Sequence, residues 1–283
     1  MVSTYAIYPQ GLLKDYVRCI AYREFNTGTE SFYKPIHPHY EIYIALMINS
    51  KVDNFIPLPG IKQVSLDRSD HPDMTFSGLH STMKGTAVYK GHIRFISMQF
   101  HPTGFFQLFG IPPALITDIL GRVTDLFSNL FVQLQEQLHE LESPFEMIDL
   151  TARFLVDKAN QQLLKKRKPT LLGITGNLQH SIHTPSIERM AYQANMSLKT
   201  FERNFHQQVG MGPKQFQRVL RFSKSLGMKL YNPQFSWTDI AHKMGYFDQM
   251  HLIKDFKSLT NYTPSEFLRT TPPPLESSAD ANY

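Results

Sequence analysis

The chain contains 283 residues, of which 42% are hydrophobic, and its formal net charge is +5. This length and composition suffice for two domains with cores of their own. The longest clearly apolar run, Ile42 to Ile48, is far shorter than the roughly 20 residues of a membrane-spanning helix, and no signal peptide is evident. The single cysteine, Cys19, excludes an intrachain disulfide and a cysteine-based zinc site. We therefore expect a soluble, cytoplasmic protein without membrane contact.

The positive charge lies in the second half of the sequence. From Lys168 to Thr270, 13 Lys and Arg residues stand against 6 Asp and Glu residues, a net charge of +7, whereas residues 1–167 are neutral overall. Neutralisation of phosphates provides most of the affinity of proteins for non-specific DNA, although a basic surface alone is weak evidence. The charge distribution favours double-stranded DNA as a partner of the second half.

Residues from about Tyr5 to His101 are predicted to form strands and loops. Runs rich in β-branched and aromatic residues alternate with clusters of Pro, Gly, Asp and Asn, a pattern typical of short strands and turns. The predicted strands are Val17 to Phe25, Tyr40 to Ile48, Val52 to Ile56, Gly85 to Tyr89 and Ile93 to Phe100.

The segment from His37 to Glu41 is the one cluster with metal-ligating residue types. On a strand, His37, His39 and Glu41 would alternate onto one face, and imidazole and carboxylate groups ligate zinc, iron or nickel. The arrangement is also similar to the first histidine motif of cupin barrels. However, the glutamate comes too early for that motif and no later histidine partner is evident. We therefore favour a loop entering a strand, with no metal and no other cofactor.

After Pro102-Thr103-Gly104 the pattern changes from strand to helix. Apolar spacing predicts helices at Ala114 to Leu120, Leu126 to Leu141 and Pro144 to about Leu164. These helices are expected to pack on the β domain or on a second subunit. The basic run from Lys165 to Lys168 then indicates a linker, either a solvated hinge or an additional phosphate contact.

The stretch from Ser186 to Phe267 contains one pattern twice, offset by 50 residues early in each copy and by 51 later. One inserted residue between Ala241 and Asp248 accounts for the change. Each copy predicts a helix, a short turn and a second helix, which is the helix-turn-helix plan whose second helix enters the major groove. The positions Ser186-Ile187, Met190-Ala191, Phe201, Phe205, Pro213 and Phe216 correspond to Ser236-Trp237, Ile240-Ala241, Leu252, Phe256, Pro264 and Phe267.

Four polar residues are placed to begin these helices, because a side-chain oxygen there accepts a hydrogen bond from a free amide of the first turn. They are Ser186, Ser197, Ser236 and Asp248, and a contact to DNA phosphate is the other role that we expect for them. Apolar spacing also predicts a helix from Leu171 to His180 and a long helix from Pro213 to Leu230. The long helix would join the two units and fix the distance between them.

The doubled motif resembles the AraC/XylS transcription regulators. Ser186 to Phe205 with Gly210-Met-Gly-Pro-Lys-Gln-Phe is similar to the first unit of that family, and Trp237 to Lys257 with Asn261-Tyr-Thr-Pro-Ser-Glu-Phe to its more diagnostic second unit. The resemblance implies two units in successive major-groove segments on one face of DNA. The motifs Pro59 to Lys62 and Arg94 to Gly104 look similar to an uncharacterised amino-terminal domain of many such regulators, which implies sensing or dimerisation and names no ligand.

In the first unit, one stripe of the second helix is predicted to read DNA. If Phe201 and Phe205 face the core, the opposite stripe carries Lys199, Glu202, Arg203 and His206, and Thr200 is a further candidate for DNA contact. Arg203 can bond guanine O6 and N7, Glu202 can accept from cytosine N4, and Lys199 can reach guanine or a phosphate. The resemblance places base contacts at Lys199, Glu202 and Arg203. The alternative is an ordinary solvated face.

In the second unit, the corresponding residues are Gln249, Met250, Ile253, Lys254 and Lys257. Met250 and Ile253 stand where the family more often has polar residues. They can contact thymine methyl groups. Alternatively, this unit grips the DNA backbone through its lysines or packs against protein.

The sequence thus predicts an α+β chain. Residues 1–164 would form a β-rich barrel or sandwich domain with following helices, residues 165–170 a basic linker, residues 171–270 an all-α DNA-binding domain, and residues 271–283 a disordered tail.

The predicted function is sequence-specific regulation of transcription, as an activator or a repressor. A small-molecule effector or homodimerisation would control it through the first domain, and RNA polymerase is the expected partner of an activator. One alternative is a constitutive DNA-binding protein whose first domain is only a dimerisation scaffold. Another is a DNA-repair enzyme fused to a DNA-binding module, but Cys19 does not resemble its reactive cysteine and no catalytic residue is predicted.

Overall fold

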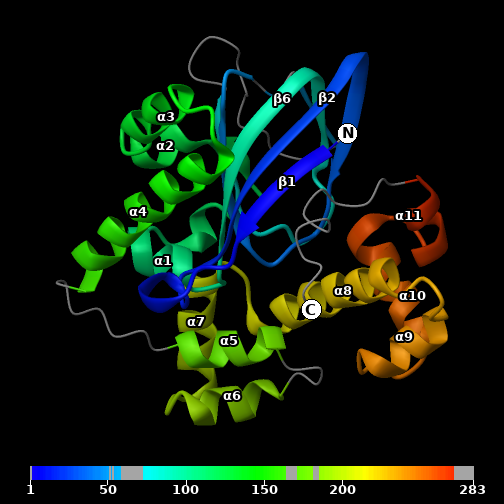
Figure 1. Ribbon diagram of the computed structural model, residues 1–283. Helices are drawn as coiled ribbons and strands as arrows, with labels where there is room; N and C mark the ends of the chain where they lie inside the picture. Colours follow the sequence, from blue (N-terminus) through cyan, green and yellow to red (C-terminus); the bar gives the residue numbers. More distant parts are fainter. Residues whose placement is uncertain are drawn as a thin grey trace.

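The computed structural model describes residues 2–50, 52, 54–58, 73–163, 171–180 and 185–270. The described part of residues 2–163, called the front domain below, contains an antiparallel sheet, and the rest is helical (Figure 1). The strands follow the order β1-β2-β6-β3-β5-β7, and β4 also pairs with β6. They are β1 Val2–Ile7, β2 Val17–Ile36, β3 Ile42–Met47, β4 Asn54–Pro57, β5 Met74–Ser77, β6 Gly85–Phe100 and β7 Leu120–Arg122.

Two long strands, β2 and β6, run along the middle of this sheet. Their register is continuous from Cys19 opposite Gln99 to Asn26 opposite His92, shifts before Ser31, and continues to Ile36 opposite Gly85. The sequence wrongly predicted the end of β2 at Phe25 and a break in β6. The glycine that suggested the break, Gly91, has a φ of 83° and lies at the shift, where a bulge interrupts the pairing without ending the strand.

Six helical segments belong to the front domain. The helices α1 to α4 gather on one side of the sheet (Figure 1). The segments are the 3-10 turns η1 Gly11–Leu13 and η2 Pro113–Leu115 and the helices α1 Gly104–Phe109, α2 Val123–Phe127, α3 Val132–His139 and α4 Pro144–Leu163.

Two of the predicted front-domain helices are wrong. The stretch Ala114 to Leu120 contains only the end of η2 and the start of β7. The stretch Leu126 to Leu141 is split between α2 and α3, because Ser128 takes a φ of 49° that no helix tolerates. Leu134 and Leu138 of α3 are nonetheless buried, so this stretch contributes to the core of the chain itself.

The described residues of the second half form helices and the turns between them, as predicted. Its helices are α5 Leu172–His180, α6 Ile187–Gln193, α7 Leu198–Val209, α8 Pro213–Tyr231, α9 Trp237–Lys243, α10 Gln249–Thr260 and α11 Pro264–Thr270. We call α6 with α7 unit 1, and α9 with α10 unit 2. The single long helix α8 joins them, with unit 1 below the sheet and unit 2 to one side in Figure 1. No helix among the described residues is long and apolar enough to cross a membrane.

Three predictions lie outside the described residues. They are the basic linker at 165–170, the tail at 271–283 and the motif Pro59 to Lys62.

Candidate DNA-binding surface

The turn between the two helices has the same construction in both units. In unit 1, Asn195 adopts a φ of 52° and the Met196 amide donates to the Ala191 carbonyl at 3.0 Å. In unit 2, Gly245 has a φ of 71° and the Tyr246 amide donates to Ala241 at 2.9 Å. Asn and Gly are the residues that tolerate this left-handed conformation. The two turns therefore begin in the same way.

The inserted residue of the repeat is Phe247. Asn195 and Gly245 are 50 residues apart, whereas the N-caps that follow, Ser197 and Asp248, are 51 apart. The extra residue therefore follows Tyr246. Its ring is 88% exposed, so the insertion adds an aromatic side chain to the surface of the turn without disturbing the core.

Helix α7 is defined by a cap at each end and by one apolar stripe. The Ser197 hydroxyl accepts from the Thr200 amide at 3.3 Å, and Gly210, with a φ of 105°, ends the helix. Phe201 and Phe205 are fully buried one turn apart. These contacts fix which face of α7 is turned outward.

The outward face of α7 carries the predicted reading residues. Lys199, Glu202, Arg203 and His206 are all exposed, at the spacing of a single helical stripe. The fifth candidate, Thr200, is half-buried, and its hydroxyl accepts from Ser197 at 2.9 Å. Thr200 therefore contributes to the cap, and the other four form a mixed-charge surface around Arg203.

Helix α10 is capped and packed like α7. Asp248 accepts from the His251 amide at 2.7 Å, and Leu252 and Phe256 are fully buried. Lys254 and Lys257 are exposed on the outer face.

The apolar part of the outer face of α10 differs from its counterpart in α7. Met250 is 57% exposed and Ile253 is half-buried. The fifth candidate, Gln249, is exposed, and its side chain accepts from the Thr238 hydroxyl of α9 at 2.8 Å. Unit 2 thus presents two lysines beside an apolar strip.

A buried ion pair attaches α10 to α8, and sequence reasoning missed it. Asp255 is only 5% exposed, and its carboxylate accepts from Arg218 at 2.7 Å and from Arg221 at 3.2 Å. The Arg221 guanidinium also lies 4.3 Å from the centre of the Tyr246 ring. Burial, together with the charge of Asp255, raises the pKa of Tyr246 to about 12. The signal was available, since Asp255 occurs at the spacing of the buried stripe of α10.

The shorter helices α6 and α9 begin with different caps. Ser186 accepts from the Arg189 amide at 3.2 Å. Ser236 accepts from the Asp239 amide at 3.1 Å, and the Asp239 carboxylate accepts in return from the Ser236 amide at 2.9 Å, a complete capping box. These bonds from Ser236 lower the pKa of Asp239. All four predicted caps are thus engaged with helix amides.

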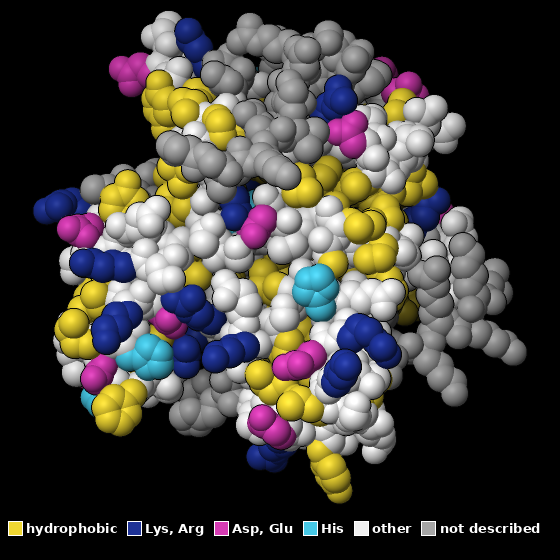
Figure 2. Space-filling view, turned by 180° about the vertical axis from the view of Figure 1, so that it is seen from behind, with side chains coloured by type: hydrophobic (Ala, Val, Ile, Leu, Met, Phe, Trp, Pro, Cys, Tyr) yellow, Lys and Arg dark blue, Asp and Glu magenta, His cyan; other side chains and the backbone are white. Residues whose placement is uncertain are grey.

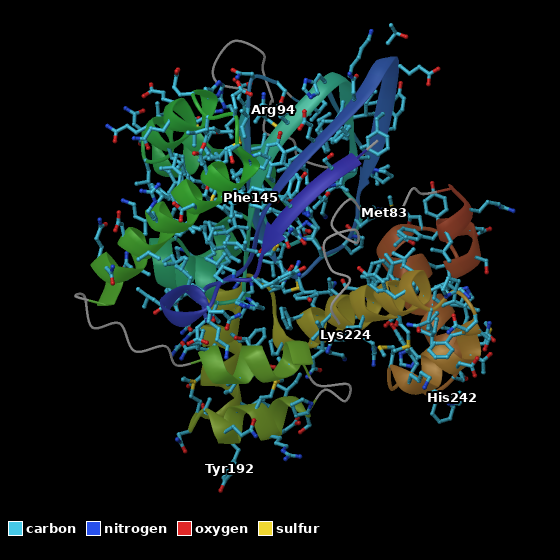
Figure 3. All side chains as sticks on the ribbon, viewed as in Figure 1. Met83, Arg94, Phe145, Tyr192, Lys224 and His242 are labelled. Atoms are coloured by element: carbon cyan, nitrogen blue, oxygen red, sulfur yellow. The ribbon has the colours of Figure 1, made fainter. Side chains whose placement is uncertain are left out.

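Lys and Arg side chains are distributed over the lower part of one face of the molecule, interspersed with Asp and Glu (Figure 2). Figure 2 shows Lys and Arg across the lower part of the molecule, over the C-terminal helices, with exposed apolar side chains at its edge. Tyr192, which is 83% exposed, projects from the bottom of unit 1, and His242 lies on the outside of unit 2 (Figure 3). Lys224 lies between them on α8, where burial lowers its pKa to about 8 and it donates to the Leu178 carbonyl at 2.9 Å.

The three metal candidates are directed to different partners. Glu41 forms an ion pair with Arg18 at 2.6 Å, His39 lies 3.2 Å from the Ser77 hydroxyl, and the His37 ring packs on Phe267. The alternation proposed for one strand fails because β2 ends at Ile36 and β3 begins at Ile42. No group of three His, Cys, Asp or Glu able to hold a metal ion occurs within the described part of the chain.

Comparison with known families gives two matches. Residues 190–270 match a helix-turn-helix domain, and residues 5–120 match a domain of unknown function (DUF6597). Both agree with the resemblances seen in the sequence.

Among curated relatives, an uncharacterized HTH-type transcriptional regulator from Haemophilus influenzae is 32% identical over 106 residues, 38% of this chain and 34% of that protein. The transcriptional activator RhaS from Escherichia coli is 32% identical over 79 residues, 28% of each chain. The alignments thus span about a third of these relatives or less. Among solved structures, ToxT from Vibrio cholerae is 11% identical, with a TM-score of 0.46 over 88% of this chain and 97% of that one.

Proposed function

The chain carries an AraC-type helix-turn-helix domain behind a domain of unknown function, and we propose that it is a transcription regulator that binds a two-segment DNA site. The observation that carries this proposal is the pair of similarly built units joined by α8. Each unit presents the outer face of its second helix, α7 or α10, with exposed Lys or Arg on it. In helix-turn-helix proteins this helix lies in the major groove.

Unit 1 would read bases. Arg203 has the forked geometry that bonds guanine O6 and N7, and it is exposed between Lys199 and His206 on the stripe. Glu202 would accept from cytosine N4, since a carboxylate is repelled by phosphates everywhere else on the duplex. Lys199 and His206 would contact guanine or the backbone.

Unit 2 would mainly hold the DNA backbone. Lys254 and Lys257 supply phosphate contacts, which fix register and orientation without reading sequence. Met250 is exposed enough to touch a thymine methyl group, and Ile253 is close to it on the same stripe. The caps Ser186, Ser197, Ser236 and Asp248 are engaged with helix amides, so any phosphate contact there would be made alongside the cap.

The front domain would control how the two units are presented. A small-molecule effector, a homodimer contact or both are the inputs that we propose, with RNA polymerase as the partner of an activator. Under the competing scaffold hypothesis, the front domain only mediates dimerisation and senses no effector. A DNA-repair enzyme is disfavoured because the thiol of Cys19 is fully buried in β2 and cannot reach a damaged base.

The proposal is tested by selecting DNA from a random pool with the purified full chain and mapping the bound sites in a genome. We expect enrichment of a motif with two conserved segments about one helical turn apart on one face of the duplex. Enrichment of no motif, with equal affinity for all fragments, would overturn it. A single conserved segment would instead limit sequence reading to one unit.

A further inference from the structure

The front domain contacts the helix that follows each helix-turn-helix unit, α8 and α11, through one short segment. Residues 37–40 lie in the connection between β2, which ends at Ile36, and β3, which begins at Ile42. The Tyr40 ring lies 5.9 Å from the Phe216 ring at 78°, and the His37 ring lies 5.0 Å from the Phe267 ring at 60°. Phe216 and Phe267 occupy the same position in the two copies of the repeat, 51 residues apart. One connection thus engages equivalent residues of the helices that follow the two units, α8 after unit 1 and α11 after unit 2.

Two hydrogen bonds add a second pair of contacts near the ends of the second helices. The Thr117 hydroxyl donates to the carbonyl of Gly210, directly after α7, at 2.7 Å. The Met83 amide donates to the carbonyl of Leu259, in the last turn of α10, at 3.0 Å. Met83 lies on the side of the front domain that is turned toward α10 and α11 (Figure 3). Each unit is therefore bonded to the front domain beside its reading helix.

This interface is packed as a protein interior is. Phe216, Phe267, Tyr40 and His37 are all buried. A Cβ atom added at Gly210 would come within 2.6 Å of the Thr117 hydroxyl and 3.0 Å of Pro113, so the two parts touch without a gap. One cluster of buried hydrophobic residues continues from the sheet through both units. Contacts of this kind have few alternative arrangements.

The connecting segment is itself held firmly by the sheet. The backbones of His39 and His80 exchange two hydrogen bonds, of 3.1 and 2.9 Å. Glu41, next to the segment, forms its ion pair with Arg18 of β2. The reading stripes on α7 and α10 meanwhile stay exposed. The front domain can therefore position the units without covering them.

We propose that residues 37–40, together with Met83 and Thr117, form a clamp that fixes the placement of the two reading helices relative to each other. The clamp residues are positioning residues, because none of them belongs to the reading stripes. This inference rests on the proposed function for its consequence in DNA binding, but the clamp itself is a property of the free protein. The competing explanation is that α8 alone, a rod about 28 Å long, fixes the placement.

A distance measurement in the free protein separates these explanations. Spin labels are attached to cysteines introduced at Tyr192 of unit 1 and Phe247 of unit 2, which are 83% and 88% exposed, while the buried Cys19 stays unlabelled. Pulsed electron resonance is then recorded on the full chain with and without His37→Ala and Thr117→Val. The control variant carries His37→Phe, which keeps an aromatic ring at this position, and Thr117→Ser, which keeps the hydroxyl.

We expect a narrow distance distribution in the parent and in the control pair, and a clearly broader or shifted one in the clamp variant. An unchanged distribution in a folded clamp variant, as judged by circular dichroism, would overturn the clamp and leave α8 as the determinant. Should the variant unfold, Thr117→Val alone is compared with Thr117→Ser in the same way, and equal distributions again overturn the proposal.

A DNA measurement tests the consequence. Affinity is compared on the selected two-segment site and on the same duplex with the second segment scrambled. The clamp variant should lose roughly tenfold on the complete site and less than about twofold on the single segment, because only simultaneous engagement depends on placement. Equal losses on both duplexes would overturn the consequence. If the parent prefers no sequence, the proposed function fails while the distance result stands on its own.

Discussion

Units 1 and 2 share a backbone plan but differ in the exposed residues of their second helices, α7 and α10, and in the contacts that attach these helices to the rest of the chain. Between equivalent positions 51 residues apart, Lys199 becomes Met250 and Glu202 becomes Ile253 on the outer face. On the inner face Phe201 becomes Leu252 and Phe205 becomes Phe256, and all four side chains are buried. The buried positions thus preserve the repeat, whereas the exposed positions differ in charge and polarity between the units.

The inner attachment differs as well. Asp255 of unit 2 is paired with two arginines of α8, whereas the equivalent residue of unit 1 is Asn204, whose amide donates to the Met196 sulfur at 3.4 Å. Unit 1 instead packs on the front domain through Gly210. Unit 2 thus adds a buried ion pair to its contact with the front domain, whereas Asn204 makes a neutral bond at the equivalent position of unit 1. The following predictions test this contrast.

The largest effect is expected from Asp255→Ala. The change leaves Arg218 and Arg221 without their shared carboxylate, and breaking a buried pair costs about 3 to 5 kcal/mol. Since both arginines are partly exposed, we expect a loss of about 2 to 3 kcal/mol in the free energy of unfolding, measured with urea.

Hydrogen exchange should locate this loss in α10. The matched control Asn204→Ala, at the equivalent position of unit 1, should cost less than about 1 kcal/mol, as a neutral hydrogen bond does. Similar losses for the two variants would show that charge does not distinguish the units.

The next effect concerns base reading by unit 1. Arg203→Ala should lower affinity for the selected site by about 1 to 3 kcal/mol and relax preference at one base pair. Lys257→Ala should weaken binding to all sequences alike and reduce the salt slope by about one. Fluorescence titration on specific and random duplexes at several salt concentrations measures both. An equal loss on both duplexes for Arg203→Ala would remove it from the base-reading set.

A smaller effect is expected at the apolar strip of unit 2. Met250→Ala removes at most one contact to a thymine methyl group, so the loss of affinity should stay below about 1 kcal/mol. Phe247→Ala serves as the control for a nearby exposed apolar side chain outside α10. A loss for Met250→Ala that matches Arg203→Ala, together with a changed base preference, would mean that both units read sequence.

The repeat was predictable from sequence because its signals are local. Caps, turn residues and apolar spacing all act within a few residues, so the boundaries of α7 and α10 and their exposed stripes followed from the motif. Asp255 was missed because its polarity suggested a solvated position, although its spacing indicated burial. Its partners lie on α8, more than 30 residues away in the sequence.

The front domain was less predictable because its decisive contacts are long-range. Gly91 suggested a strand end, but the pairing of β6 with β2 carries the strand through a bulge. The residues from His37 to Glu41 suggested a metal site by their types alone. Their position between two strands disperses them, and two of them, His37 and Tyr40, meet Phe267 and Phe216 from the distant half of the chain. No local pattern encodes such a meeting.

The smallest effect is a difference between the two units in how acid destabilises the first turns of their helices. In unit 2 the Ser236 bonds lower the pKa of Asp239, and at the start of the following helix, α11, the Thr263 bonds lower that of Glu266. Because both folded-state pKa values lie below the unfolded ones, these carboxylates stabilise helix starts above the unfolded pKa, and this contribution is lost as pH falls through the folded pKa. In the first copy of the repeat, Arg189 stands at the position of Asp239 and Gly212 at that of Thr263. Neither residue takes part in a cap with a carboxylate that titrates in acid.

Hydrogen exchange between pH 5 and pH 3, normalised to intrinsic rates, should therefore show α9 and α11 losing protection before α6 and α8. The variant Asp239→Asn should remove the pH dependence in α9. Simultaneous loss in all four helices would mean that acid acts on a structure shared by both units, with the caps contributing nothing separate.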